Sequence, residues 1–307
     1  ADDWSDLQTL KQVACKRLPR SRPAAGGTNK EQKGRDRLTA IQREVEMLKK
    51  AKHPNINKIE GVVVGEDAVH IFLQLVSGGD LFSYLVKKGR LDAPEAKFVL
   101  YQLLLGLRYL HEEVNVAHRD IKLENIILAT SGPFPKVQLA DFGQSRSATQ
   151  SFRSLNGTLQ YMAPEQLVAW TRKGGYSGKR ADMWSLGIVL ALLLTGSHPF
   201  EPWSSSPNSP SGQSQGGLSV FGASAAMELD NNPGDLSLCR AVVKGEVALG
   251  SSGFGSAKNA ARALLLSNLL AHDPATRATA LEALESSWIS MSRKELEALY
   301  EKVVGKG

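Results

Sequence analysis

The chain has 307 residues, of which 42% are apolar and 22% are charged, and its net charge is +6. This is ordinary globular composition, sufficient for one large core or two modest ones. The two cysteines, Cys15 and Cys239, lie far apart and outside any metal-binding spacing, which excludes a disulfide framework and favours a reducing compartment. The longest apolar run, residues 186–194, is too short to cross a bilayer. We therefore expect no membrane anchor and a location in the nucleus or cytoplasm.

The start of the chain is basic. Much of the positive charge lies in residues 11–37, where no aromatic residue interleaves with the lysines and arginines. Single-stranded nucleic-acid sites combine both features, so we expect a solvated loop here and no direct contact with nucleic acid. The acidic opening, ADDWSD, is not a signal peptide. The first residue is Ala rather than Met, which favours a fragment or a processed chain.

The first predicted element is a strand over residues 11–17, KQVACKR. Its period of two places Ala14 and Lys16 on one face and Cys15 on the other. We expect the Cys15 thiol to be an inert core group rather than a reactive one. A Pro- and Gly-containing loop is predicted over residues 19–34.

A helix is predicted over residues 36–52, because apolar residues recur there along one stripe. Pro54 ends it, and strands follow at residues 59–64 and 69–75. The turn SGGD at 77–80 then separates a strand-rich part of the chain from a helix-rich part.

In the helix-rich part, Asp92 and Glu95 form a capping-box pattern before a helix over residues 93–111. That helix is apolar nearly all round, so it is expected to be buried. Short strands bracket a loop at 126–140. Residues 202–236 are rich in Ser, Gly, Pro and Asn and are interpreted as a mobile insertion. The further predicted helices cover residues 180–195, 257–271, 278–286 and 292–304.

Four short motifs follow one another along this framework. They are VACK at 13–16, HRDIKLEN at 118–125, DFG at 141–143 and APE at 163–165. One such motif occurs by chance in many chains, but four in this order and in fitting strand and helix contexts resemble the protein kinase signature. The resemblance extends over residues 11–290.

The resemblance implies an α+β protein with the bilobal protein kinase fold. Residues 1–75 would form a small, β-rich and incomplete N-lobe, and residues 76–307 a larger helical C-lobe that carries the insertion at 202–236. The Gly-rich loop that should cover the phosphates is missing, because none of the residues before Lys16 is Gly. Either the kinase is truncated, or it is a pseudokinase that has lost its nucleotide lid. The survival of every catalytic carboxylate favours truncation.

The resemblance also assigns roles in phosphoryl transfer from ATP. Asp120 would accept the proton of the substrate hydroxyl, Lys122 would lie against the transferring phosphate, and Lys16 would reach the α- and β-phosphates. Asn125 and Asp141 would hold Mg²⁺, which favours hard oxygen ligands. The polarity of HRDIKLEN, between apolar runs, is thereby explained by a metal–phosphate cleft rather than by a buried ion-pair network without chemistry.

The acid that fixes Lys16 is expected on the helix at 36–52. Glu44 is the best match, because it lies nine residues before the HPN motif. Glu46 is the alternative, and it lies about 200° round the helix from Glu44, so both cannot face Lys16.

The segment IFLQLVSGGD would contact the nucleotide base. Leu73 matches the gatekeeper position, the backbone of Gln74 and Val76 would bond adenine, and Asp80 would reach the ribose. The nucleotide-binding set implied by the resemblance is Ala14, Lys16, Glu44, Gln74, Val76, Asp80, Glu124, Asn125 and Asp141.

Other matches are structural. Glu165 is expected to pair with Arg277, and Asp182 is expected to brace the catalytic loop. Four residues match the stacked apolar spine of active kinases, which plain core packing would also explain: Leu48, Ile59, His118 and Phe142.

The type of kinase follows from further motifs. Lys122 and GTLQYMAPE resemble serine/threonine kinases, in which Thr158 would bond Asp120 and Lys122. VSGGDLFSYL, LLTGSHPF and DPATRATALEALESSWI resemble the calcium/calmodulin-dependent group, and within it the checkpoint kinases that carry forkhead-associated domains. The chain contains no such domain, and Gln144 replaces the usual Leu after DFG.

The implied partners are protein substrates and an activator, with a role in checkpoint or stress signalling. Asp80 and Glu124 would favour a basic residue upstream of the target Ser or Thr. Ser154, between DFG and APE, is the expected activation site, modified by an upstream kinase or by autophosphorylation. Its phosphate would meet Arg119.

Overall fold

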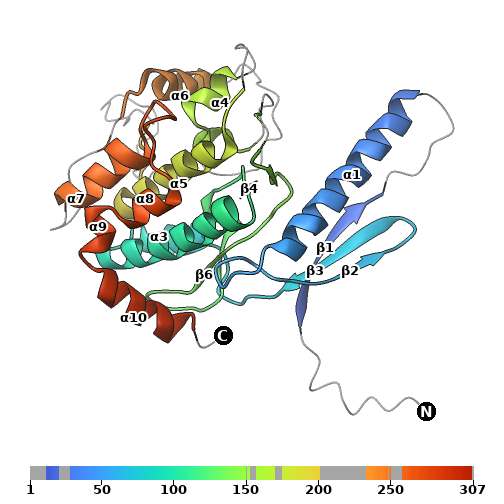
Figure 1. Cartoon of the computed structure of the whole chain (residues 1–307), viewed down its shortest axis with the longest axis horizontal. Helices are drawn as coiled ribbons and strands as arrows, with labels where there is room; N and C mark the ends of the chain where they lie inside the picture. Colours follow the sequence, from blue (N-terminus) through green and yellow to red (C-terminus); the bar gives the residue numbers. More distant parts are fainter. Residues whose placement is uncertain are drawn as a thin grey trace, which may run out of the picture.

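The computed structural model has a small sheet-containing lobe and a larger helical lobe (Figure 1). It describes residues 12–20, 28–149, 151–152, 157–169, 175–200, 233–247, 249 and 258–305.

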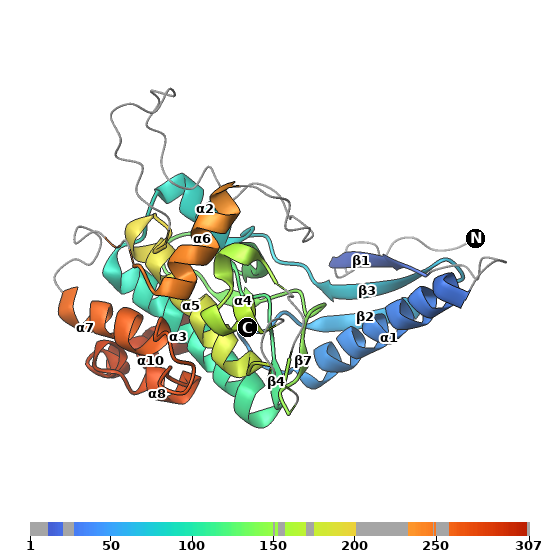
Figure 2. The same ribbon diagram turned by 90° about the horizontal axis from the view of Figure 1, so that it is seen from above.

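The small lobe contains three strands, β1 (Val13–Pro19), β2 (Ile59–Val64) and β3 (Ala68–Gln74), in the antiparallel order β1-β3-β2. Helix α1 (Thr28–Lys50) runs alongside this sheet (Figure 2). The expected start of α1 at residue 36 was wrong, because the helix begins inside the stretch predicted as a loop.

Cys15 does not lie in the core. The prediction of an inert core thiol was wrong, because Cys15 is an exposed free cysteine on β1. Lys16 is only partly exposed, so the alternation along the strand was correct, but the covered face is the one that carries Lys16.

The large lobe is built around two buried helices, α3 (Ala93–Arg108) and α5 (Gly178–Thr195). Asp92 caps α3 by accepting a hydrogen bond from the backbone of Glu95 at 2.9 Å, as its sequence pattern predicts. A π-helical turn, Tyr109–Glu113, extends α3. The apolar side chains of α3 and α5 belong to one continuous core with residues of the other helices and strands, and this core supports the loops that carry the polar motifs.

Short paired strands hold these loops. β4 (Val116–Ala117) pairs with β7 (Arg146–Ser147), and β5 (Ile126–Leu128) pairs with β6 (Val137–Leu139). The catalytic motif HRDIKLEN therefore lies between β4 and β5, and the DFG motif directly follows β6.

Within the described residues, four α-helices were not predicted: α2 (Leu81–Lys88), α4 (Pro164–Val168), α6 (Pro233–Lys244) and α9 (Ser287–Ser290). Helix α6 begins inside the stretch interpreted as an insertion, and residues 202–232 of that stretch lie outside the described residues. The C-terminal helices are α7 (Lys258–Ala263), a π-helical segment (Leu264–Leu269), α8 (Ala280–Leu284), α9 (Ser287–Ser290) and α10 (Arg293–Val303). Among the helices in the described ranges, none is both long and apolar enough to cross a membrane.

Candidate active site

Lys16 joins the two lobes through two carboxylates. Its Nζ atom lies 2.6 Å from Glu44 Oε1 on α1 and 2.7 Å from Asp141 Oδ1 in the DFG motif. Glu44 is buried, so α1 is docked with this acid facing the cleft. The pairing expected for Glu44 is present, and the alternative, Glu46, is not the residue that contacts Lys16.

The charges of this group stabilise one another. Burial opposes the ionisation of Lys16, but Asp141 and Glu44 outweigh it, so the pKa of the Lys16 ammonium is raised. Burial also opposes the ionisation of Asp141, but the hydrogen bond and charge of Lys16 outweigh it, so the pKa of the Asp141 carboxyl is lowered. Lys16 and Asp141 are therefore both charged near neutral pH, as phosphate and metal binding requires.

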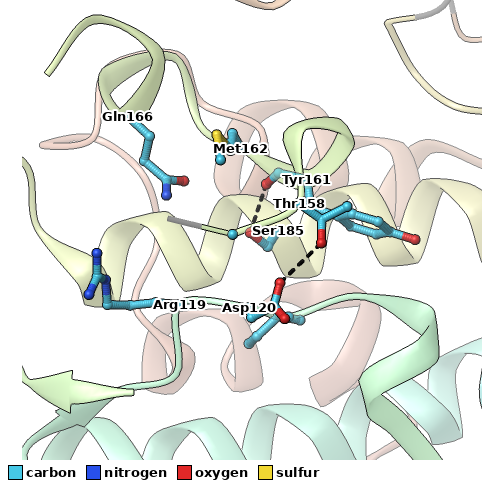
Figure 3. Close-up of a pocket in the computed structure, with 9 residues that line it drawn as sticks. Arg119, Asp120, Thr158, Tyr161, Met162, Gln166 and Ser185 are labelled. Carbon is cyan, nitrogen blue, oxygen red and sulfur yellow. Dashed lines mark hydrogen bonds between the residues drawn. The ribbon is translucent and has the colours of Figure 1, made fainter. Parts of the chain in front are cut away.

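A second polar cluster is centred on Asp120. It lies on the loop of residues 118–125 between β4 and β5, which is called the catalytic loop below. Thr158 Oγ1 donates to Asp120 Oδ1 at 3.1 Å (Figure 3), and Lys122 Nζ lies 3.1 Å from Asp120 Oδ2 and 2.9 Å from Thr158 Oγ1. Asn125 Nδ2 donates to both the backbone oxygen and Oδ2 of Asp120 at 2.8 Å. The Asp120 carboxylate is thus held in one orientation by three neighbouring side chains.

Asp182 on α5 holds the backbone of the catalytic loop in place. This α5 carboxylate is buried and accepts backbone hydrogen bonds from His118 at 2.8 Å and from Arg119 at 2.7 Å. It also contacts the His111 ring at 2.8 Å. Arg119 has a φ of 69°, which is uncommon for a residue other than Gly, so these bonds hold a strained backbone next to Asp120. The brace expected for Asp182 is therefore present.

A small cavity of about 10 Å³ lies between the catalytic loop and the segment before α4. Figure 3 shows Asp120 and Thr158 pointing toward each other at its edge, while Ser185 on α5 donates to the backbone oxygen of Tyr161 at 2.7 Å. Helix α5 consequently supports both the catalytic loop and the APE segment.

The oxygen atoms of Asn125 and Asp141 fit a magnesium site. Asn125 uses its Nδ2 group toward Asp120, and Asp141 uses Oδ1 toward Lys16 and the backbone N–H of Gly143. Within the described part of the chain, no hydrogen bond engages Asn125 Oδ1 or Asp141 Oδ2. One carboxylate and one amide oxygen are few ligands, which is typical of Mg²⁺ held together with substrate phosphates and water.

Gln74, at the end of β3, and Val76, in the segment after it, are the residues whose backbone was expected to bond adenine. The backbone N–H of Gln74 donates to Lys58 at 2.8 Å, and its carbonyl accepts from Asn57 Nδ2 at 3.1 Å, which leaves one carbonyl lone pair. The backbone of Val76 has no hydrogen bond with another described residue, so both of its polar groups are available. Asp80 caps α2, with both carboxylate oxygens accepting from Ser83.

Arg119 already has aromatic neighbours. Its guanidinium lies 4.0 Å from the centre of the Phe152 ring and donates to the Tyr176 hydroxyl at 3.0 Å. Phe152 and Tyr176 pair through their backbones. Ser154, the expected activation site, lies outside the residues that the structure describes.

Of the expected spine, the contact between His118 and Phe142 is present, and the expected pair of Glu165 and Arg277 is also present. His118 and Phe142 are buried and stack edge to face with ring centres 4.9 Å apart. Arg277 donates to both oxygens of Glu165, at 2.6 and 3.0 Å.

The comparison with known families agrees with this geometry. A model described as the protein kinase domain matches residues 6–289. This chain belongs to the protein kinase family. Its small sheet-rich lobe and larger helical lobe are the two lobes of the protein kinase fold.

Several curated serine/threonine kinases are similar to this kinase. The meiosis-specific serine/threonine-protein kinase mek1 of Schizosaccharomyces pombe is 42% identical over 166 residues, which is 51% of this chain and 37% of mek1. The serine/threonine-protein kinase SRK2I of Arabidopsis thaliana is 38% identical over 163 residues, 52% of this chain and 44% of its own. The probable serine/threonine-protein kinase fhkC of Dictyostelium discoideum is 39% identical over 166 residues, 53% of this chain and 27% of its own. The chain thus spans less than half the length of these relatives.

Sequence reasoning missed several polar residues around the site. Asn55 and Asn57, which follow α1, and Gln138, on β6, are all buried. Phe152 and Tyr300 each contact partners far away in the sequence. Only the polarity of Gln138 between Val137 and Leu139 could have drawn attention to it, because a buried amide requires partners.

Proposed function

We propose that this protein is a serine/threonine kinase, which transfers the γ-phosphate of ATP to Ser and Thr hydroxyls of proteins. One observation carries the proposal: Lys16, paired with Glu44 and Asp141, occurs together with an Asp120 carboxylate oriented by Lys122 and Thr158. Phosphoryl transfer depends on positioning and charge neutralisation more than on covalent chemistry. Both clusters supply such groups.

The residues of the chain divide this work between them. Asp120 orients the substrate hydroxyl and accepts its proton, while Lys122 provides positive charge beside the same carboxylate. Lys16 binds phosphate oxygens, and Glu44 keeps its ammonium in place. Asn125 and Asp141 would hold Mg²⁺, which supplies charge neutralisation at the phosphates when it is bound. The base would contact Ala14 and the backbone of Gln74 and Val76.

Activation by phosphorylation of Ser154 is a second part of the proposal, whether an upstream kinase or the enzyme itself adds the phosphate. The cationic group that would receive this phosphate is Arg119, and Arg146 adds to it. Burial and the nearby charge of Arg119 lower the pKa of Arg146, which indicates that like charges gather there. A phosphate would relieve that repulsion.

Substrates with a basic residue upstream of the target fit the acids at the edge of the cleft. Burial raises the pKa of the Glu124 carboxyl, and Glu124 Oε2 is buried without a hydrogen-bond partner in the described structure. A cationic side chain of the substrate that donates a hydrogen bond to this oxygen would therefore stabilise the complex. Asp80 lies near enough to add to the negative potential at Glu124, although its ribose contact would compete with the substrate.

The finer family assignment remains a proposal. Membership of the calcium/calmodulin-dependent group, a role in checkpoint or stress signalling, and a nuclear or cytoplasmic location rest on the motif resemblance. The domain division is likewise a proposal: an N-lobe over residues 1–75 and a C-lobe over residues 76–307, with an insertion at 202–236.

A non-catalytic kinase-fold scaffold is the alternative function. The intact cluster at Asp120 favours catalysis instead.

The decisive experiment is a transfer assay with radiolabelled ATP and Mg²⁺. Substrates are Ser, Thr and Tyr versions of one peptide, each with Arg or Glu upstream. We expect transfer to the Ser and Thr peptides with upstream Arg, and none in Asp120→Asn. Nucleotide binding without any transfer would establish the scaffold alternative, and equal use of Arg and Glu peptides would reject the substrate preference.

A further inference from the structure

Helix α10 lies beyond residue 289, where the match to the kinase family ends. It packs under α3 at the bottom of the large lobe (Figure 1). The Tyr300 ring lies edge to face against Tyr101 of α3, with ring centres 6.0 Å apart. The end of α10 is also tied down, because the backbone oxygen of Val304 accepts from Lys136 Nζ at 3.4 Å.

From this helix, Tyr300 reaches the loop that follows α1. Its hydroxyl donates to Asn55 Oδ1 at 2.8 Å across 245 positions of sequence. The amide orientation of Asn55 is fixed by chemistry, because Nδ2 lies 2.8 Å from the backbone oxygen of Val137, which can only accept. The oxygen of the amide must therefore face Tyr300.

Asn55 lies between two segments that carry active-site carboxylates, α1 with Glu44 and the segment after β6 with Asp141. Its Nδ2 also donates to Gln102 Oε1 at 3.1 Å, and its backbone oxygen accepts from Leu139 at 2.8 Å. Asn55 follows α1, which carries Glu44, and Leu139 on β6 precedes Asp141 by two residues. Glu44 and Asp141 are the two carboxylates that bind Lys16.

We propose that Tyr300 is a positioning residue of this kinase, which holds Asn55 and thereby aligns Glu44 and Asp141 around Lys16. The proposal rests on the proposed function for its catalytic consequence, but its structural part concerns contacts within the chain alone. It assigns to α10, outside the matched kinase domain, an effect on nucleotide binding that acts through Asn55.

The contact is suited to this task. Asn55 is fully buried, so removal of the Tyr300 hydroxyl leaves an amide oxygen without a partner in a place where water cannot easily replace it. Burial raises the pKa of Tyr300 to about 12, and the hydroxyl therefore remains a donor throughout the neutral range. Tyr101, its neighbour, is a matched control, because its hydroxyl is not part of the Asn55 network.

The test compares Tyr300→Phe with Tyr101→Phe in the full chain. Hydrogen exchange without nucleotide should accelerate in residues 51–58 and 137–141 of Tyr300→Phe only. The Kd of Mg·ADP, and the KM for ATP, should rise by about 2- to 10-fold in the same variant, the range expected for one lost hydrogen bond. Neither quantity should change in Tyr101→Phe.

Two results would overturn this inference. One is equal exchange and equal Mg·ADP affinity in Tyr300→Phe and the wild type. The other is a loss of thermal stability that is the same in both Phe variants, with unchanged exchange in residues 51–58. A wild-type chain that binds Mg·ADP but transfers no phosphate would contradict the proposed function, while the exchange and binding measurements would still decide the role of Tyr300.

Discussion

The hydroxyl of Thr158 donates to Asp120 Oδ1 at 3.1 Å, although the two residues belong to separate loops. This bond, with those from Lys122 and Asn125, leaves the Asp120 carboxylate little freedom. An oriented carboxylate in a cleft is suited to accept a proton from a hydroxyl.

The first prediction is that Asp120→Asn abolishes phosphoryl transfer without loss of the fold. Removal of the base should lower kcat by about 10²–10⁴-fold, which corresponds to about 3–5 kcal/mol in the activation free energy. The unfolding free energy should change little, because Asn retains the shape of the side chain. A variant that keeps more than half of the wild-type turnover would contradict the assignment of Asp120.

The second prediction distinguishes the role of Lys16 from that of Asp141. Lys16→Met should reduce kcat by about 10²–10³-fold, the cost of one lost electrostatic contact to the nucleotide phosphates, while nucleotide still binds. Asp141→Ala should instead abolish the dependence of nucleotide binding on Mg²⁺. Calorimetric titration of ATP with and without Mg²⁺ checks both, and an unchanged Mg²⁺ dependence in Asp141→Ala would exclude this residue as a metal ligand.

The third prediction concerns activation. Ser154→Ala should lower turnover by about tenfold or more, because it removes the phosphate that would bind Arg119 through charge-assisted hydrogen bonds. Ser151→Ala serves as the control and should retain activity. Mass spectrometry of active protein should find phosphate at Ser154, and an active protein unmodified at Ser154, Ser151 and Thr158 would argue against the mechanism.

The fourth prediction tests the buried ion pair. Arg277 is fully buried and donates to Glu165 and to the backbone oxygens of Ala271 and Arg180. Arg277→Met leaves all three acceptors without this donor, so the unfolding free energy should fall by about 3–5 kcal/mol. Glu165→Gln keeps one amide oxygen that can accept from Arg277 and leaves the backbone hydrogen bonds of Arg277 in place, so it should cost less. Urea unfolding measures both, and equal losses in the two variants would show that the charge, rather than the buried donors, sets the stability.

The sequence predicted the main supports of the site well. The helix around residues 93–111 and the one around 180–195 are apolar on nearly every side, a pattern that only a buried helix satisfies. The VACK motif and the spacing of Glu44 from HPN were enough to indicate that Lys16 and Glu44 would meet, whereas the contact between Lys16 and Asp141 was not predicted. Their relative placement depends on spacing that the family shares.

Other features could not be read from a linear pattern. Residues 28–35 are polar and basic, so the start of α1 has no apolar stripe to reveal it. Alternation along β1 correctly separated Cys15 from Lys16, but it could not show which face the second lobe covers. The bond between Tyr300 and Asn55 spans 245 positions, and no local rule connects residues so far apart.

The last prediction concerns pH and a histidine away from the cleft. His198 is 3% exposed, and both ring nitrogens are engaged: Nε2 lies 2.8 Å from the backbone oxygen of Gln160, and Nδ1 accepts from the backbone N–H of Phe200 at 3.2 Å. A proton on Nδ1 would break the second bond. Burial lowers the pKa of His198 to about 4, although the bond to Gln160 opposes this shift.

Because the folded pKa of His198 lies below the unfolded value of about 6.5, the unfolded chain binds the proton first as the pH falls. The contribution of uncharged His198 to the free energy of unfolding is therefore fully present above about pH 6.5. It is lost as the pH falls toward 4, by about 3 kcal/mol in total. His198→Gln keeps a donor and an acceptor but does not titrate. The wild type should thus lose stability relative to this variant between pH 7 and 4.5 in urea unfolding. His53, whose pKa is also lowered to about 4, is present in both proteins and cancels from the difference. A difference that stays constant across this range would show that folding does not shift the pKa of His198.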